Sequence, residues 1–178
     1  MRLAFVTMVL AGLLAGCKSH KAPSTDDSDL TEKGDKEMKN TMPQGRLLSV
    51  SYNYQGMMME PIRNKELTRK DGTPTIKFEF VGEERQFAVS DTLFDTARAI
   101  IEEEQMYNYR GYYSLGKMGL EVLDGYNWSF DATFEGDESI SSGGSNNSPG
   151  GDGLHRIDKL LFDTAVQSLK DAGEEVPW

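Results

Sequence analysis

Hydrophobic and polar residues alternate with a period of two in several parts of the chain, a pattern typical of half-buried β-strands. The clearest example spans residues 128–134, where Trp128 and Phe130 share one face with further large apolar side chains. Residues 48–54 and 76–80 alternate in the same way. Shorter patterns and turn signals predict further strands at residues 63–69, 85–89 and 139–142. The strand at 63–69 is the most polar of these, so we expect it at an edge of the sheet.

Two other stretches repeat apolar residues with the period of an α-helix. The first is expected to run from Thr92 to about Met106, with Ser90 and Asp91 supplying capping oxygens. Its apolar stripe consists of Leu93, Ala97, Ile100 and Ile101. The second is expected from Leu154 to Ala172, with Asp152 at its N-cap and Gly173 as a stop.

These elements predict an α+β fold. The strands follow one another through short turns, so the sheet is expected to be mainly antiparallel, with about five or six strands. Two amphipathic helices need an apolar sheet face to cover, and we expect both to pack on one side. The stretch from residue 107 to residue 124 gives no clear pattern because its glycines interrupt any long element.

The chain before residue 46 has a different composition. Residues 18–45 contain few apolar side chains and alternate charges of both signs, so they cannot bury enough surface to offset the entropy of ordering. We therefore expect a flexible tether here, with a packed N-terminal arm as the alternative. The expected organisation is a signal peptide at residues 1–16, the cysteine and tether at 17–45, and a single domain at 46–178.

The N-terminus has the three parts of a secretory signal. Arg2 precedes an apolar run from Leu3 to Leu14, and small residues lead to Cys17, the only cysteine of the chain. The run is about 12 residues long, whereas a membrane-spanning helix needs about 20. The sequence Leu14-Ala15-Gly16-Cys17 resembles the lipobox of bacterial lipoproteins. The resemblance implies cleavage before Cys17, fatty acyl chains such as palmitate on that cysteine, and a periplasmic or surface-exposed protein anchored in a membrane. A cleaved signal with an incidental cysteine is the alternative.

The net charge of the chain excludes some classes of binding partner. The formal net charge is −10, which argues against nucleic acid and against electrostatic adhesion to anionic lipid. We therefore expect the acyl chains on Cys17 to hold the protein at the membrane, and no nucleic-acid partner. With that cysteine acylated, no thiol is left for a disulfide, so the domain must fold on its hydrophobic core.

A second resemblance covers most of residues 46–161. It rests on residues 124–130, 140–144 and 151–154, and on a segment at 66–72 before a strand. Together these segments resemble a group of small secreted or lipid-anchored proteins of gut bacteria. The resemblance implies a shared domain, and it carries no catalytic role over to this chain.

Residue chemistry gives little support for catalysis. The chain has two histidines and no G-x-S-x-G motif, and no Cys/His cluster that would bind a metal, so we expect neither a cofactor nor a metal ion. Calcium bound by oxygen ligands of residues 137–152 stays open as an alternative. Paired carboxylates for glycan cleavage also stay open, because 29 acidic residues offer many pairs.

Aromatic density points to a candidate binding surface. Amphipathic rings are common at binding sites, and loops rich in Gly, Ser and Asn expose backbone donors and acceptors. The candidate residues are Tyr107, Tyr109, Tyr112, Tyr113, Asn146, Asn147 and Asp152. The alternative is that the tyrosines fill the core and the loop glycines only permit turns.

We therefore expect a lipid-anchored cell-envelope protein that binds an envelope protein or a glycan without catalysis. An envelope enzyme acting on glycan or peptide through paired carboxylates is the second hypothesis. A purely structural role in an envelope complex is the third.

Overall fold

The computed structural model describes residues 40–56, 60–69, 72–109, 111–114 and 125–176. The chain divides into two compact units, Met1–Glu37 and Met38–Trp178, and every described residue belongs to the second. The predictions for the signal peptide, for Cys17 and for the tether as far as residue 39 concern residues outside these ranges.

The second unit contains a seven-stranded sheet with the order β4-β3-β2-β1-β6-β7-β5. Neighbouring strands are antiparallel except β5 and β7, which are parallel. The sequence predicted about five or six strands; β5, which has three residues, lies in the stretch from 107 to 124 where glycines interrupt the pattern. The strands are β1 (Leu47–Gln55), β2 (Ile62–Thr68), β3 (Thr75–Phe80), β4 (Glu83–Ala88), β5 (Tyr112–Ser114), β6 (Asn127–Phe134) and β7 (Ser139–Ser145).

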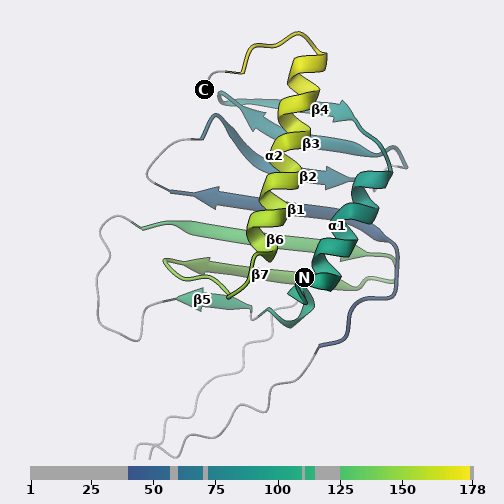
Figure 1. The fold of residues 1–178 in the computed structure, drawn as a ribbon, viewed down its shortest axis with the longest axis vertical. Helices are drawn as coiled ribbons and strands as arrows, with labels where there is room; N and C mark the ends of the chain where they lie inside the picture. The colour runs from purple at the N-terminus through teal and green to yellow at the C-terminus, as the bar shows by residue number, and fades with distance from the viewer. Residues whose placement is uncertain (1–39, 57–59, 70–71, 110, 115–124, 177–178) are drawn as a thin grey trace, which may run out of the picture. The chain divides into compact units, whose positions relative to one another are not determined.

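Both helices lie on the same face of the sheet, as the sequence predicted (Figure 1). The helix α2 (Gly153–Asp171) crosses the middle of the sheet, α1 (Thr92–Glu103) runs beside it, and a short 3-10 helix, η1 (Met106–Asn108), follows α1. At the left of Figure 1, the ends of β1 and β6 extend past both helices. The core lies between the two layers and includes Val50, Phe130 and Leu161, each 0% exposed.

The strand β2 lies inside the sheet, between β1 and β3, so the prediction of an edge strand is wrong. A bulge explains the polar sequence of β2. Asn64 has a φ of 52°, and the register with β3 shifts between Arg63 and Glu66. The extra residue reverses the alternation, so that Lys65 and Leu67 face the helices with 1% and 0% exposure. The sequence of β2 therefore looks more polar than its position in the sheet suggests, because one of its core-facing positions holds a lysine.

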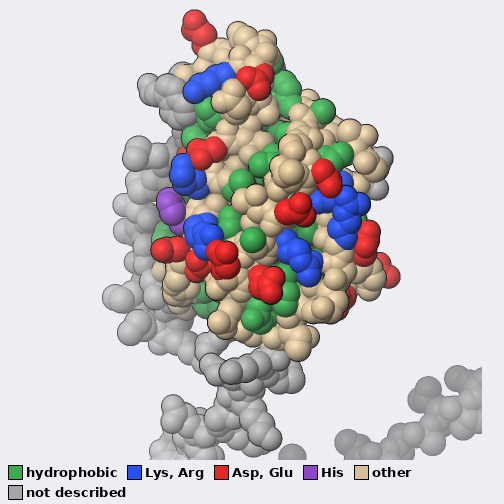
Figure 2. Space-filling view, turned by 45° about the vertical axis from the view of Figure 1, so that its right-hand side comes forward, with side chains coloured by type: hydrophobic (Ala, Val, Ile, Leu, Met, Phe, Trp, Pro, Cys, Tyr) green, Lys and Arg blue, Asp and Glu red, His purple; other side chains and the backbone are tan. Residues whose placement is uncertain are grey.

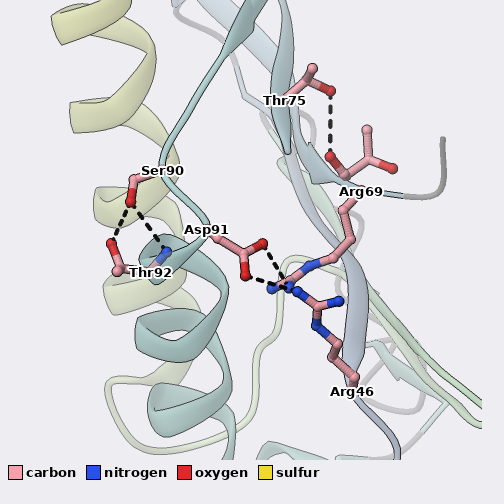
Figure 3. A network of polar contacts seen from close by, with 7 residues as sticks. Arg46, Arg69, Thr75, Ser90, Asp91 and Thr92 are labelled. Carbon is pink, nitrogen blue, oxygen red and sulfur yellow. Dashed lines mark hydrogen bonds and ion pairs between the residues drawn. The ribbon is translucent and has the colours of Figure 1, made fainter. Parts of the chain in front are cut away.

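Only one of the predicted capping oxygens bonds to a helix end. Ser90 Oγ accepts a hydrogen bond from the backbone N–H of Thr92 at 3.3 Å. The two carboxylate oxygens of Asp91 instead bind Arg46 and Arg69, each at 2.8 Å (Figure 3). Asp152 occupies the N-cap position of α2 as predicted, but within the described part of the chain its side chain makes no capping hydrogen bond.

The residues at positions 42–45, which are followed by Arg46 and then β1, pack on the domain, and we call them the leading segment. The Arg98 guanidinium donates to the backbone oxygens of Pro43, at 2.9 Å, and of Gly45. Pro43 is buried, and a Cβ on Gly45 would lie 2.2 Å from the carbonyl oxygen of Glu135. Glycine is thus required where the chain passes the end of β6. The leading segment belongs to the packed structure although its sequence resembles the rest of the tether.

Candidate functional site

A pocket of about 350 Å³ lies between the end of β1, the start of β6 and the beginning of α2, and we call it the aromatic pocket. Its volume lies at the lower end of the range for small-molecule sites. The strand ends form one wall, and the first turns of α2 with the preceding loop form the other. The lining residues are the aromatic Tyr52, Tyr54, Tyr126 and Trp128, the titratable Glu60, His155 and Asp158, and Leu154, Ser148, Pro149 and Gly151.

Strand geometry brings the four aromatic side chains together. Tyr52 and Tyr54 are two residues apart on β1, and therefore point to the same face of the sheet. Tyr54 is directly opposite Trp128 in the antiparallel ladder, and Tyr126 lies two residues before Trp128. The rings of Tyr54 and Tyr126 stack at 5.6 Å between centroids with an interplanar angle of 25°. Tyr52 and Trp128 are buried, whereas Tyr54 and Tyr126 are half-buried and keep part of their surface open to a ligand.

The loop between β7 and α2 holds this wall in place. Asn146 Oδ1 accepts a hydrogen bond from the backbone N–H of Tyr126 at 2.8 Å. The backbone oxygen of Asn147 accepts one from the Trp128 indole N–H at 2.7 Å. Asn146 also adopts a φ of 54°, a conformation that asparagine tolerates better than most residues. The Asn146 side chain and the Asn147 backbone therefore hold the aromatic wall in position, and the pocket lining includes neither residue.

A buried ion pair lies beside the aromatic wall. Lys65 is paired with Tyr52 across the β1–β2 ladder, and its side chain is 1% exposed. Lys65 Nζ lies 2.8 Å from Asp158 Oδ1 and 3.6 Å from Glu60 Oε2, and 5.7 Å from the centre of the Phe162 ring. The side chains of Asp158 and Glu60 are 30% and 40% exposed. One ammonium group thus lies under two carboxylates that reach the pocket surface.

The Tyr52 hydroxyl is a hydrogen-bond donor at neutral pH. Burial raises the pKa of this phenol well above its ordinary value, and the negative charge of Asp158 raises it further. The aromatic pocket therefore combines ring surfaces, carboxylate acceptors and a protonated phenol.

Two of the predicted tyrosines lie away from this pocket. Tyr107 and Tyr109 line a separate, mostly polar hollow of about 510 Å³ beside β7. The Tyr109 ring packs edge-on against Phe130 at 6.4 Å, and its hydroxyl would lie 2.5 Å from a Cβ at Gly153. Burial, with a contribution from the charge of Glu104, raises the pKa of Tyr109 to about 12. These contacts assign Tyr109 to the packing of α2 on the sheet.

The other two predicted tyrosines differ from each other. The rings of Tyr113 and Trp128 pack together with 5.9 Å between their centroids, so Tyr113 supports the aromatic wall. Tyr112 is 64% exposed at the edge of the sheet. Asp152 is exposed at the start of α2. None of the seven predicted residues lines the aromatic pocket: Asn146, Asn147 and Tyr113 contact the residues of its wall, and Tyr107, Tyr109, Tyr112 and Asp152 lie elsewhere.

Sequence reasoning missed Glu60, Lys65 and Asp158. No local pattern assigned these three charged residues to the interior. Asp158 adjoins Ile157 in the apolar stripe of α2, and Lys65 faces the core only because of the bulge at Asn64. Tyr52 and Tyr54 were recognised as strand residues, but nothing local links them to α2.

Arg46, Arg69 and Asp91 form a second polar cluster, shown in Figure 3. The Arg69 guanidinium lies 3.7 Å from the centre of the Phe94 ring, and its burial lowers its pKa, an effect that Asp91 opposes. Both oxygens of Asp91 are engaged by arginines, so the cluster joins α1 to β1 and to the end of β2. Elsewhere on the face shown in Figure 2, acidic and basic side chains are mixed.

Within the described ranges, no group of three or more His, Cys, Asp or Glu side chains could hold a metal ion. The described helices include none with the length and hydrophobicity needed to cross a membrane.

Comparison of the chain with protein-family models, with curated proteins and with solved structures finds no match.

Proposed function

We propose that this protein is a lipid-anchored domain of the bacterial cell envelope that binds a ligand in the aromatic pocket without catalysing a reaction. The lipobox-like sequence ending at Cys17 supports the anchor and the location. The observation that carries the binding role is the aromatic pocket itself, which combines half-buried rings with a small set of convergent polar groups.

The ion pair favours binding over catalysis. Lys65 Nζ lies 2.8 Å from Asp158 and 3.6 Å from Glu60, so both carboxylates already face a cation of the protein itself. Carboxylates that face an ammonium group act as hydrogen-bond acceptors. Two acceptors with fixed positions suit recognition of a ligand that carries hydroxyl or N–H groups.

An envelope enzyme acting on glycan or peptide through paired carboxylates is the second candidate. The observation that favours it is that Glu60, Asp158 and His155 line the same pocket. An imidazole and two carboxylates within one pocket could share acid and base roles.

The test uses the protein without its signal peptide and compares Tyr126→Ala with Tyr112→Ala. Tyr126 lines the pocket, whereas Tyr112 is an exposed tyrosine outside its lining. We expect envelope glycans or peptides to perturb the NMR signals of Trp128 and His155, and Tyr126→Ala alone to remove the effect. Equal binding by both variants would contradict the proposal.

Mass spectrometry of the recovered ligand separates the two candidates. An unchanged ligand supports binding alone. Turnover that Asp158→Asn abolishes would replace the binding proposal with the enzyme.

A further inference from the structure

We infer that the ligand of the aromatic pocket is a neutral carbohydrate, with one sugar ring packed against Tyr54 and Tyr126 and its hydroxyl groups bound by Glu60 and Asp158. This inference rests on the proposed function and specifies the chemistry of its ligand.

The aromatic wall suits the apolar face of a sugar ring. A pyranose presents C–H groups on its flat faces and hydroxyls around its rim. Tyr54 and Tyr126 are half-buried and stack on each other, so their rings are held in position before a ligand arrives. The wall is further fixed by the hydrogen bond from the Tyr126 backbone to Asn146. A pre-organised wall lowers the entropy cost of binding.

The carboxylates suit the rim of the ring. An ionised carboxylate has about four acceptor positions, and Lys65 can occupy only part of those on Asp158 and Glu60. Both side chains remain partly exposed, at 30% and 40%, and both line the pocket. Their remaining lone pairs can accept hydrogen bonds from sugar hydroxyls.

Lys65 disfavours a cationic ligand. A ligand ammonium would be most strongly attracted at the position nearest both carboxylates. Lys65 Nζ already occupies that position, 2.8 Å from Asp158 and 3.6 Å from Glu60. A second cation would meet a like charge there and find the negative charges partly compensated.

An anionic ligand is disfavoured for a different reason. Among the described residues that line the pocket, Glu60 and Asp158 carry carboxylates and His155 carries an imidazole, whereas the Lys65 side chain is 1% exposed and cannot contact a ligand directly. An anion would therefore meet two carboxylates of its own sign. A neutral polyol with an apolar face satisfies the remaining requirements.

Three sugars of the same ring size give a matched test of charge. The protein lacking its signal peptide is titrated at pH 6 with glucose, glucosamine and glucuronate, followed by NMR signals of Trp128 and His155. N-acetylglucosamine, galactose and neutral oligosaccharides extend the neutral set, and cyclohexylamine is a cation that is not a sugar. We expect at least one neutral sugar or oligosaccharide to bind about tenfold tighter than every charged probe.

Two variants and a control locate the binding. Tyr126→Ala is expected to lower the affinity for the neutral sugar by about tenfold or more, and Glu60→Gln is expected to lower it by several-fold. Tyr112→Ala should leave the affinity unchanged. Circular dichroism melting curves show that each variant is folded, and Glu60→Gln is the gentler change because that side chain is 40% exposed.

The outcomes separate this inference from the proposed function. If cyclohexylamine or glucuronate binds the pocket and no neutral sugar does, the carbohydrate inference is overturned while a binding role stands. If sugars bind but Tyr126→Ala and Glu60→Gln have no effect, the site is elsewhere and the inference fails. If no probe and no envelope fraction perturbs the pocket, both proposals fail.

Discussion

At the scale of single residues, Lys65 shows how a charge is accommodated in the core of this domain. Its ammonium group meets Asp158 at 2.8 Å, and the partly exposed Glu60 lies 3.6 Å away. Because a buried charge is costly unless it is paired, this lysine depends on carboxylates supplied by α2 and by the approach to β2. The same carboxylates reach the aromatic pocket, so the residue that joins α2 to the sheet also sets the charge of the candidate site.

Phe130 and Asp131 test the assignment of faces on β6. Phe130 is 0% exposed and its ring contacts Tyr109, so Phe130→Ala should leave a cavity and lower the free energy of unfolding by about 3–5 kcal/mol. Asp131 is exposed on the other face and accepts a hydrogen bond from Ser141 Oγ at 2.6 Å. Asp131→Asn keeps an acceptor oxygen and should cost less than about 1 kcal/mol. Urea denaturation measures the free energy of unfolding of both variants, and equal losses would mean that the period or the face assigned to this strand is wrong.

Tyr109 should make the domain less stable at high pH. Burial and, second, the charge of Glu104 disfavour the phenolate, and raise the pKa of Tyr109 from its ordinary value of 10.0 to about 12 in the fold. Below pH 10.0 the phenol is protonated in both states and adds no pH dependence. From there to about pH 12 the unfolded state loses its proton first, so the free energy of unfolding falls as pH rises.

Urea denaturation between pH 9 and pH 11 compares Tyr109→Phe with wild type, and Tyr112→Phe is the control at an exposed ring. The Tyr109→Phe variant should lose less stability over this interval. The same slope in all three proteins would refute the assignment, since other alkaline effects are common to them.

At the scale of elements, the leading segment is the least expected part of the fold. Arg98 on α1 donates hydrogen bonds to the carbonyls of Pro43 and Gly45, and its guanidinium lies 5.7 Å from the centre of the Phe134 ring. The hydrogen bonds connect α1 to the chain before β1. They also fix the point at which any tether leaves the domain.

A chain beginning at Arg46 should therefore be less stable than one beginning at Asn40, by about 1–3 kcal/mol. The loss comes from the buried Pro43 and from the hydrogen bonds of Arg98. Chemical denaturation of both chains, each with and without Arg98→Ala, forms a double-mutant cycle. Arg98→Ala should cost more in the longer chain. An equal cost in both would show that the leading segment contributes nothing through Arg98.

At the scale of the whole molecule, the proposed anchor and the aromatic pocket lie in different parts of the chain. The proposed lipid attachment at Cys17 is separated in sequence from the first described residue, Asn40. A binding domain held in this way would act on ligands close to the membrane surface.

Cys17→Ser is expected to release the protein from membranes or to block its processing. Acyl chains need a thiol at this position, and a net charge of −10 offers no electrostatic substitute at an anionic bilayer. Metabolic labelling with a fatty acid and membrane fractionation check the result. Wild-type protein that takes up no label and fractionates as soluble would refute the lipid anchor.

The sequence alone determined the class of fold and the position of the main elements. Alternation on β1, β3 and β6 and the apolar stripes of α1 and α2 indicate which face of each element is buried. The spacing of apolar residues within one element is enough to define its apolar face. The tertiary structure decided which elements meet. The interior position of β2, the bulge that turns Lys65 inward, and the meeting of β1, β6 and α2 at the aromatic pocket depend on pairing between distant segments. Local patterns do not specify such long-range partners, so Tyr107, Tyr109, Tyr112 and Tyr113, which aromatic density singled out, are not part of the pocket lining that the fold assembles.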